Sequence, residues 1–256
     1  MKAISMFFAV AVLSIFYVTA NADSEVEITV SAAISLKNAL EKIGKLFEDN
    51  HKGVKVIYNF GASGSLARQI EGGAPVDVFA PADQKDMDDI DNKGLVVPGT
   101  RVDFVGNSVV LIVPASETAA IDSFDDLKLA KIKKVAIGNP KTVPAGRYAQ
   151  DVLNFYKVLP TIGDKLILAE NARQALDYVA RGEVDAGVVY LTDAMLRSKE
   201  VKVVSTASMK SHRPIAYPIA VVRGTKNKRL SGDFIKAVKS ETAQGIFRDY
   251  GFTTAK

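Results

Sequence analysis

The sequence predicts an α/β fold of two lobes, in which each lobe is a mixed, mostly parallel sheet flanked by helices. Strand-like runs alternate with helical patterns nearly to the end of the chain, which is typical of layered α/β proteins. No Gly/Ser-rich linker occurs between residues 23 and 256, so ordered segments would have to join the two lobes. Two long apolar stretches, residues 107–114 and 217–223, suit strand-like hinge crossings between them.

These two crossings would make one lobe discontinuous in sequence. If the chain leaves the first lobe at one crossing and returns at the other, that lobe comprises residues 23–105 plus 214–256. Residues 106–213 then form an inserted second lobe. A cleft would lie between the two lobes.

The individual elements follow from residue type and spacing. Short runs rich in β-branched residues predict strands over residues 54–60, 76–80, 108–113, 134–138, 166–169, 186–190, 201–205 and 219–222. Apolar residues at helical spacing predict helices over residues 36–50, 84–93, 145–159, 172–181 and 230–250. Prolines at 81, 114, 140 and 160 fall in the connections, as expected of residues that interrupt regular structure.

Residues 1–22 have the pattern of a cleaved secretory signal. Lys2 precedes an apolar run over residues 3–18, and residues 20–22, Ala-Asn-Ala, supply the small-x-small cleavage pattern. The apolar run is short for a helix that spans a bilayer. We therefore expect a mature chain that begins near Asp23 and is free in a bacterial periplasm.

The chain has no cysteine and a formal net charge of +4. An exported chain without Cys carries neither a disulfide nor a lipid on an N-terminal Cys, so its core depends on burial alone. Its charges are scattered, and no basic run is interleaved with aromatic residues, so nucleic-acid binding is not expected. Mild basicity would attract an anion without identifying it.

Two stretches of the predicted first lobe share a pattern that suits an anion. In residues 26–36 and again in residues 54–69, a short apolar strand runs into small and hydroxyl residues, and a helix follows at once. Small side chains leave the N–H groups of a helix N-terminus open, beside the hydroxyls of Ser35 in one stretch and of Ser63 and Ser65 in the other. Two such stretches facing one cleft would hold a small oxyanion.

Three segments of the predicted second lobe have a related pattern. A helix opens at Ala145 after a strand, Asn171 is a predicted N-cap for a helix that opens at Ala172, and another strand ends in Tyr190. Taken singly, each segment reads as an ordinary capped helix or a core tyrosine. Their occurrence at the ends of consecutive strands favours a ligand site, because open α/β sheets bind ligands there.

A secreted serine hydrolase is one alternative. Residues 61–65, Gly-Ala-Ser-Gly-Ser, resemble G-x-S-x-G, but the last position is Ser where that turn needs Gly. A catalytic triad also requires a His, and both His51 and His212 lie in polar surroundings that predict surface positions. The pattern disfavours this alternative.

Sites for bare metal cations have little support. The chain has no Cys and two His far apart, and the acidic residues 83–91 lack the Gly and bidentate Glu of a calcium loop, which favours a solvated helix face. A ferric site built from tyrosines stays open, although no pair among the candidates has ligand spacing: Tyr148, Tyr178, Tyr190 and Tyr217.

Taken in order, several motifs resemble those of the periplasmic molybdate-binding proteins of ABC importers, within the class II periplasmic substrate-binding proteins. They cover essentially the whole chain after the signal and lie at residues 32–39 (AAISLKNA), 66–77 (LARQIEGGAPVD), 82–84 (ADQ), 143–146 (VPAG), 189–190 (VY) and 250–252 (YGF). The resemblance implies the two-lobed fold, capture of molybdate and also tungstate, and delivery to a membrane permease. It implies no catalysed reaction and no cofactor, with molybdenum bound only as the oxyanion, and we expect a monomer.

The resemblance also implies a set of site residues. Side-chain and backbone donors would come from the first lobe, and backbone N–H groups and one phenol from the second: Ser35, Ser63, Ala145, Ala172 and Tyr190. Ala62 and Gly64 interrupt the run of hydroxyl residues that the family tends to carry, so Ser65 is the alternative to Ser63.

Such a donor set has a physical preference among oxyanions. Molybdate, tungstate and sulfate are unprotonated dianions near neutral pH, whereas phosphate keeps a proton that wants an acceptor. None of the five residues is a carboxylate, although Asp77 and Asp185 lie near them in sequence. Because sulfate has the same charge as molybdate, a sulfate binder stays an alternative, and cavity size would decide between them.

Overall fold

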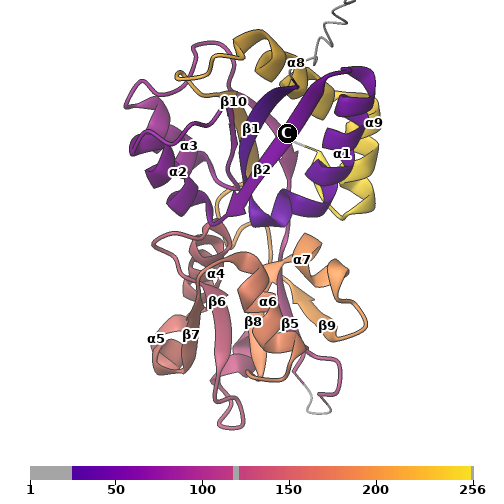
Figure 1. Cartoon of the computed structure of the whole chain (residues 1–256). Coiled ribbons are helices and arrows are strands. Elements are labelled where there is room, and N and C mark those ends of the chain that lie inside the picture. The colour runs from indigo at the N-terminus through magenta and orange to yellow at the C-terminus, as the bar shows by residue number, and fades with distance from the viewer. Residues whose placement is uncertain (1–24, 118–120, 255–256) are drawn as a thin grey trace, which may run out of the picture.

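The computed structural model describes residues 25–117 and 121–254 of the chain. Within these residues the protein consists of two mixed sheets, each flanked by helices, and the two resulting lobes lie one above the other (Figure 1). The predicted signal, residues 1–22, lies outside the described residues. Among the helices that are described, none has both the length and the apolar character needed to cross a membrane.

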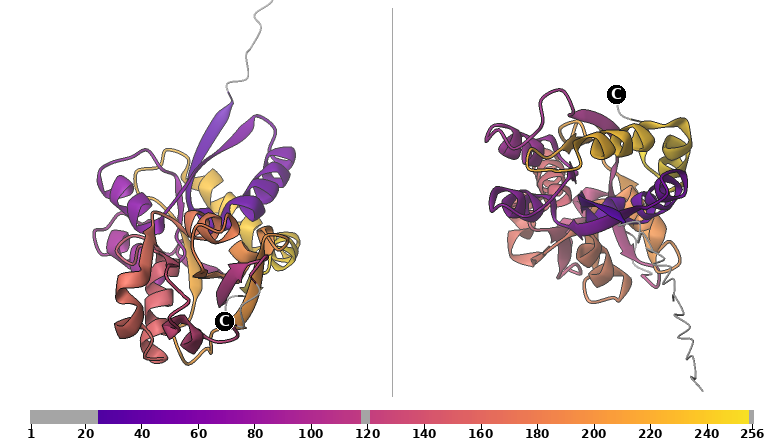
Figure 2. Two further views of the ribbon diagram at one scale, coloured as in Figure 1. Left: turned by 90° about the horizontal axis from the view of Figure 1, so that it is seen from below. Right: turned by 45° about the horizontal axis from the view of Figure 1, so that its top comes forward.

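The first lobe is built on a sheet with the strand order β11-β4-β10-β3-β1-β2. Its strands are β1 (Val26–Ala33), β2 (Val54–Gly61), β3 (Val78–Ala80), β4 (Val102–Gly106), β10 (Ala216–Val221) and β11 (Thr253–Thr254). Its helices are α1 (Lys37–Asn50), α2 (Ser63–Glu71), α3 (Gln84–Asp91), α8 (Lys228–Lys239) and α9 (Glu241–Asp249), with a short 3₁₀ turn η1 (Ile34–Leu36) before α1. Helices α8 and α9, near the C-terminal end of the chain, pack beside α1, which lies near its N-terminal end (Figure 2).

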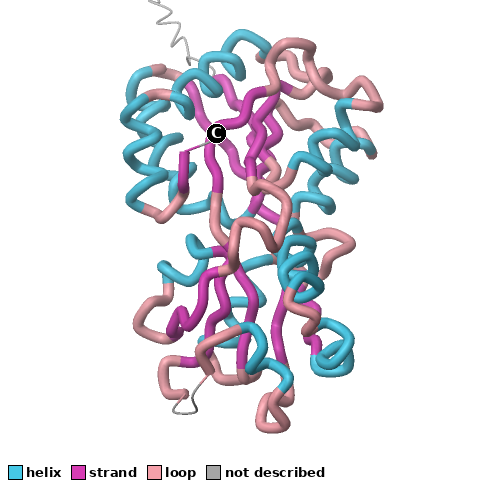
Figure 3. The backbone as a smooth tube through the Cα atoms, turned by 180° about the vertical axis from the view of Figure 1, so that it is seen from behind, coloured by secondary structure: helices cyan, strands magenta, loops and turns pink. Residues whose placement is uncertain are grey.

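The second lobe has the strand order β7-β6-β8-β5-β9. Its strands are β5 (Val109–Pro114), β6 (Val135–Gly138), β7 (Leu166–Ala169), β8 (Ala186–Tyr190) and β9 (Val201–Thr206). Its helices are α4 (Pro144–Phe155), α5 (Leu159–Ile162), α6 (Ala172–Ala180) and α7 (Leu191–Leu196), with 3₁₀ turns η2 (Phe124–Lys128) and η3 (Gly163–Lys165). In both lobes the sheet lies inside and the helices outside (Figure 3).

Helices α4 and α6 cover opposite faces of the second sheet. Along β6, Val135 and Ile137 pack with residues of α4, whereas Ala136 between them packs with residues of α6. Successive side chains of a strand point to opposite faces, so a strand that is apolar throughout is buried on both sides. This is why the central strands β5, β6 and β8 of the second lobe are recognisable in the sequence as continuous apolar runs.

The sheets are mixed, as predicted, but parallel pairing does not predominate. In the first sheet β1 pairs in parallel with β2 and β3, while β10 pairs antiparallel with both β3 and β4, and β11 antiparallel with β4. In the second sheet β6 pairs in parallel with β7 and β8, while β5 is antiparallel to β8 and β9. Apart from the short β11, the strands that introduce antiparallel pairing are β4, β5, β9 and β10, which lie next to the passages between the lobes.

The predicted helix over residues 230–250 is wrong, because two helices occupy it. Ser240 interrupts the helical backbone with φ −62° and ψ 155°, and its hydroxyl accepts a hydrogen bond from the N–H of Ala243 at 3.2 Å. Serine competes with the helix for backbone groups, and here it ends α8 and caps α9.

One of the two predicted crossings also differs. The chain passes from the first sheet to the second through residues 107 and 108, between β4 and β5, and this short passage is strand-like on both sides. It returns through residues 207–215, which form no strand. The predicted crossing over residues 217–223 is wrong, because this apolar stretch contains most of β10, which pairs with β3 and β4 inside the first sheet.

Candidate functional site

All five residues predicted for the site line one small pocket between the two lobes. The first lobe contributes the ends of β1 and β2 and the starts of the helices that follow, and the second contributes the starts of α4 and α6 and the end of β8. The lining residues are Ala33, Ile34, Ser35, Gly61, Ala62, Ser63, Ala82, Val143, Pro144, Ala145, Ala172 and Tyr190.

Strand register explains why residues so distant in sequence meet. In the first sheet β1 and β2 run in parallel, and the final residues Ala33 and Gly61 are paired neighbours. Ser35 and Ser63 each lie two residues beyond those ends, so they emerge side by side. In the second sheet the parallel strands β6, β7 and β8 likewise end at one edge, which is where an open α/β sheet presents its ligand site.

The structure places Ser63, and not Ser65, at the pocket. Ser63 is completely buried, and its Oγ accepts a hydrogen bond from the N–H of Ala82 at 3.0 Å. Ser65 does not line the pocket, and its Oγ accepts from Arg68 Nη2 at 3.2 Å on the outer side of α2. The sequence did not decide between these two hydroxyls. In the structure the direction in which α2 begins places Ser63 at the pocket and Ser65 away from it.

The second lobe presents backbone donors at two helix starts. Ala145 and Ala172 lie in the first turns of α4 and α6, whose N–H groups have no acceptor within the helix. The predicted N-cap is confirmed, because Asn171 Oδ1 accepts from the N–H of Gln174 at 3.0 Å. Each helix adds partial positive charge at the pocket through its dipole.

Tyr190 completes the wall at the end of β8. Its side chain is buried, and its hydroxyl donates to the carbonyl oxygen of Ala82 across the interlobe boundary at 3.3 Å. Burial raises the pKa of the Tyr190 hydroxyl well above its usual value, so the group is a hydrogen-bond donor at neutral pH.

The start of α4 approaches β6 so closely that only glycine fits at position 146. A Cβ at Gly146 would lie 1.9 Å from the carbonyl oxygen of Gly138. We expect Gly146→Ala to lower the free energy of unfolding by about 1 to 3 kcal/mol, because the helix start must shift. Urea unfolding measures this, with Gly232→Ala as the matched control. A Cβ there meets nothing within 4 Å, so that variant should be as stable as the wild type or slightly more so; equal losses in both would contradict the steric argument.

An arginine bridges the two lobes directly beside the pocket. Arg147, on α4, donates from Nε to Asp83 Oδ2 at 2.9 Å and from Nη2 to Asp86 Oδ2 at 2.5 Å. Both carboxylates belong to the first lobe and are 2% exposed. A third contact runs from Arg147 Nη1 to the carbonyl oxygen of Pro140 at 3.4 Å, within its own lobe.

The prediction of a solvated helix face over residues 83–91 is therefore wrong for its buried side. Asp86 lies one position before the buried Met87 on α3 and faces the second lobe, while Asp88, Asp89 and Asp91 stay near solvent. Burial raises the pKa of Asp86 to about 6, and the charge of Arg147 opposes that rise. Charge count alone did not distinguish a buried carboxylate that has a partner from a solvated one.

A second arginine makes a comparable bridge on the other side. Arg173, on α6, donates from Nε to Asp193 Oδ1 at 2.9 Å and from Nη2 to Asn38 Oδ1 of the first lobe at 2.9 Å. Asp193 is fully buried, its Oδ2 has no hydrogen-bond partner among the described residues, and burial raises its pKa to about 6. Both Arg147 and Arg173 are paired with carboxylates, and neither lines the pocket. The lining itself is therefore neutral.

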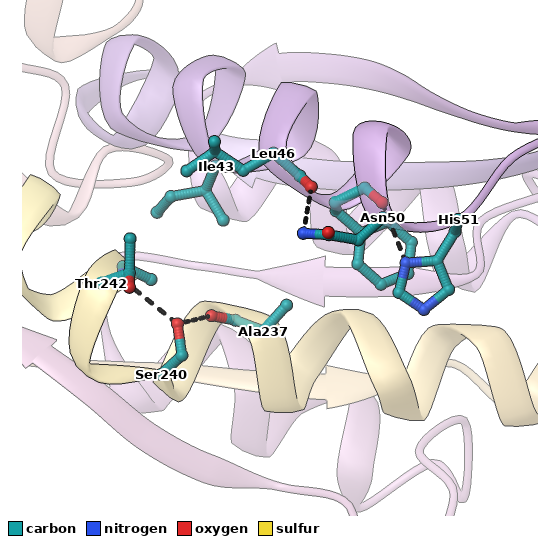
Figure 4. A pocket seen from close by; sticks show the side chains of 9 residues that line it. Ile43, Leu46, Asn50, His51, Ala237, Ser240 and Thr242 are labelled. Atoms are coloured by element: carbon teal, nitrogen blue, oxygen red, sulfur yellow. Dashed lines mark hydrogen bonds between the residues drawn. The ribbon is translucent and has the colours of Figure 1, made fainter.

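The two histidines do not meet Ser63. His51 lies in a separate hollow between α1, α8 and α9, stacked on Phe47 with ring centroids 4.0 Å apart (Figure 4). Its Nδ1 lies 2.9 Å from the carbonyl oxygen of Phe47, and His212 Nδ1 lies 2.7 Å from that of Arg213. Neither residue lines the pocket, so the parts of a serine hydrolase triad are not assembled.

Three of the four candidate tyrosines gather behind the pocket, which the sequence did not predict. The ring centroids of Tyr148 and Tyr190 are 6.2 Å apart, and those of Tyr190 and Tyr217 are 5.9 Å apart. Burial raises the pKa of each hydroxyl, which opposes the phenolate form that a ferric ion needs. Among the described residues no group of three or more His, Cys, Asp or Glu could hold a metal ion.

Two residues that the sequence did not indicate as part of this site, Tyr217 and Asn107, lie behind Ser35. Ser35 Oγ is 3.3 Å from the hydroxyl of Tyr217, and that hydroxyl is 2.9 Å from Asn107 Nδ2. Both partners are buried. Asn107 lies in one passage between the lobes and Tyr217 lies in β10 just after the other, in segments where the sequence showed apolar residues and no motif. Only the register of β4 and β10 brings them together.

Known proteins agree with this architecture. A family model described as bacterial extracellular solute-binding protein matches residues 28–253. The molybdate-binding protein ModA of Escherichia coli is 43% identical over 251 residues, which cover 96% of this chain and 96% of that protein. The ModA of Haemophilus influenzae is 36% identical over 232 residues, covering 89% and 90%.

Among solved structures, the periplasmic molybdate-binding protein of Azotobacter vinelandii superposes with a TM-score of 0.79 at 24% identity. The match covers 90% of this chain and 100% of that one, and at this identity it shows the shared fold. With a family model that matches most of its length and relatives above 30% identity, the chain belongs to the bacterial extracellular solute-binding proteins.

Proposed function

We propose that this protein captures molybdate, and also tungstate, in the pocket between its lobes and delivers it to the permease of an ABC importer. The observation that carries the proposal is the chemistry of the lining. Among the described residues, every lining side chain is apolar or a neutral hydroxyl, and the pocket collects hydroxyl and backbone donors from both lobes. The names of the relatives, molybdate-binding proteins in Escherichia coli and Haemophilus influenzae, point to the same ligand.

In this proposal Ser35 and Ser63 donate from the first lobe, and Ala145, Ala172 and Tyr190 donate from the second, with the Tyr190 proton turning from the carbonyl oxygen of Ala82 to the anion. Hydrogen bonds to a charged acceptor are roughly twice as strong as neutral ones, and two helix starts add partial positive charge. A dianion can therefore be held without a lysine or arginine in contact. Arg147 and Arg173, in the helices whose starts line the pocket, support this, since both are already paired with buried carboxylates.

The donor set also supports the proposed preference against phosphate. The two carboxylates that raised doubt are engaged elsewhere: Asp77 accepts from the N–H of Thr29 at 2.7 Å, and Asp185 from those of Lys133 and Lys134. Asp83 is the carboxylate nearest to the lining in sequence, but it accepts from Arg147 and from the N–H of Lys85. No acceptor among these carboxylates is thus free for the proton that phosphate carries.

The proposal includes closure of the lobes around the anion. We place the lobe boundaries near residues 105/106 and 213/214, close to the passages over residues 107–108 and 207–215 in which the chain changes sheets. Contacts between the lobes surround the pocket, among them the hydrogen bond from the N–H of Gly64 to the carbonyl oxygen of Thr142 at 3.0 Å. A ligand that touches both lobes favours the closed form. We further propose cleavage of residues 1–22, a periplasmic location, a monomeric state and no catalysed reaction.

Titration calorimetry on the chain from Asp23 onward tests the ligand. We expect saturable binding of molybdate and tungstate at one site per chain, weaker binding of sulfate, and no heat from phosphate at the same concentrations. Sulfate has the same charge as molybdate but shorter bonds to oxygen, so it would leave the donors of the two lobes too far away. Binding of phosphate without binding of molybdate would overturn the proposal.

A further inference from the structure

A buried chain of hydrogen bonds runs from the passage between the lobes to the pocket. Asn107, in that passage, donates from Nδ2 to the hydroxyl of Tyr217 at 2.9 Å, and the same hydroxyl lies 3.3 Å from Ser35 Oγ. Tyr217 is completely buried, and Asn107 and Ser35 are 8% and 5% exposed. Of the three, only Ser35 lines the pocket.

The direction of the first hydrogen bond is determined by a backbone group. The N–H of Ser108 donates to Asn107 Oδ1 at 2.9 Å, which identifies that atom as the oxygen of the amide. The other end of the amide is therefore Nδ2. Its two protons go to Thr192 Oγ1 at 2.9 Å and to the hydroxyl of Tyr217.

The direction of the second hydrogen bond follows from the first. Because the Tyr217 oxygen accepts from Asn107, its own proton must go to another acceptor. Burial raises the pKa of Tyr217, so the proton is retained at neutral pH. Ser35 Oγ is the acceptor within reach, since the buried carboxylate oxygen Asp193 Oδ2 makes no hydrogen bond to any described residue.

Ser35 therefore does not donate to Tyr217 and keeps its own proton for another acceptor. Its oxygen accepts from Tyr217 through one lone pair, which leaves the proton and the second lone pair for the pocket that Ser35 lines. Ser63 has the same arrangement by a different route, because its oxygen accepts from the N–H of Ala82. Both serines thus keep a proton for the ligand, and one of the two lone pairs on each oxygen is already in use.

We propose that Asn107 and Tyr217 are positioning residues that hold the Ser35 hydroxyl as a donor and so make the pocket selective for unprotonated oxyanions. The inference rests on the proposed function. A serine hydroxyl that is free to turn can accept a proton from hydrogen phosphate as readily as it donates to molybdate. The chain from Asn107 occupies one of the two lone pairs of the Ser35 oxygen. Accepting from hydrogen phosphate then needs the remaining lone pair and turns the Ser35 proton away from the ligand, so selectivity arises as a penalty on the wrong ligand.

Two substitutions test this by altering the chain without touching the lining. Tyr217→Phe removes the donor to Ser35, and Asn107→Asp replaces the donor to Tyr217 with an acceptor, which reverses both hydrogen bonds. We expect the ratio of the phosphate Kd to the molybdate Kd, measured by calorimetry at pH 8, to fall about tenfold in Tyr217→Phe and further in Asn107→Asp. At that pH both ligands are dianions, so the negative charge that Asn107→Asp adds weakens both alike and cancels from the ratio.

Tyr148→Phe is the matched control. Tyr148 is a neighbouring buried tyrosine whose hydroxyl contacts the carbonyl oxygen of Pro214 at 3.4 Å and has no link to Ser35. Its variant should keep the wild-type ratio, whereas a general loosening of the buried tyrosines would change the ratio in all variants. If Asn107→Asp does not fold, Tyr217→Phe decides, because it loses a single oxygen atom.

The outcomes separate the two proposals. Wild-type protein that binds molybdate, with an unchanged ratio in Tyr217→Phe, overturns the positioning role and leaves the function standing. Wild-type protein that does not bind molybdate overturns the proposed function and the inference with it. A fall in the ratio confined to variants of Asn107 and Tyr217 supports the inference, since a merely structural loss would weaken both ligands equally.

Discussion

Replacing Arg147 with methionine should weaken molybdate binding by roughly 100-fold to 1000-fold, as measured by calorimetry at pH 8. In the closed form this substitution leaves the buried Asp86 without its arginine, and the neighbouring Asp83 with only the half-exposed Arg213 at 3.7 Å. Removing one partner of a buried ion pair typically costs about 3 to 5 kcal/mol, mostly because the other charge stays desolvated. The arginine and the carboxylates belong to different lobes, so opening the cleft exposes the unpaired carboxylates to water. The substitution therefore disfavours the closed form, and this raises the Kd for molybdate.

Two further variants show whether the uncompensated charge is the cause. Arg147→Met combined with Asp83→Asn and Asp86→Asn removes both carboxylates and should recover most of the lost affinity. Arg213→Met is the matched control, because Arg213 is half exposed and lies 3.7 Å from the same Asp83 oxygen. Exposed ion pairs contribute about 0 to 1 kcal/mol, so this variant should bind almost as well as the wild type.

The pH dependence of the Arg147→Met variant follows from the same carboxylates. Burial raises the pKa of Asp86 to about 6 even with Arg147 present, and without the arginine it must lie higher. Protonation removes the buried charge, so the defect should shrink as the pH falls from 8 to 6. A defect that stays constant over this range would indicate that Arg147 acts through packing and not through its charge.

The pocket could be predicted from the sequence because its residues follow strand ends. Ser35, Ser63 and Ala172 each come shortly after an apolar strand, at the start of a helix, and parallel strands carry such positions to one edge. Both the strand and the helix start are local features, visible as residue types at short spacing. The resemblance to a known family then selected these positions from other helix starts.

The contacts behind the pocket depend on register and on the approach of one lobe to the other, which no local pattern carries. Tyr217 reaches Ser35 because β10 pairs with β3, which in turn pairs with β1, and Asp86 is buried because Arg147 comes from the other lobe. An aspartate in an acidic helix looks solvated until its partner is placed. The same limit applies to the return passage over residues 207–215, which has no apolar signal, so that the predicted crossing fell on β10 instead.

Removing both serine hydroxyls should nearly abolish binding at concentrations that saturate the wild type. Ser35→Ala and Ser63→Ala each remove a buried donor to a charged ligand, worth roughly 1 to 3 kcal/mol. The two hydroxyls make separate protein contacts, to Tyr217 and to Ala82, so the losses in the double variant should approximately add. Calorimetry of the two single variants and the double variant measures this.

Ser63→Ala should cost more than Ser35→Ala, for a reason internal to the fold. Ala82 is buried, and its N–H would lose the oxygen of Ser63 as its acceptor in addition to the loss of the donor to the anion. Ser65→Ala is the matched control, since that hydroxyl bonds to Arg68 on the outer side of α2 and should leave Kd unchanged. A loss at Ser65 that equals the loss at Ser63 would mean that α2 begins in a different register when the anion binds, and the donor assigned to this wall of the pocket would have to be moved by two residues.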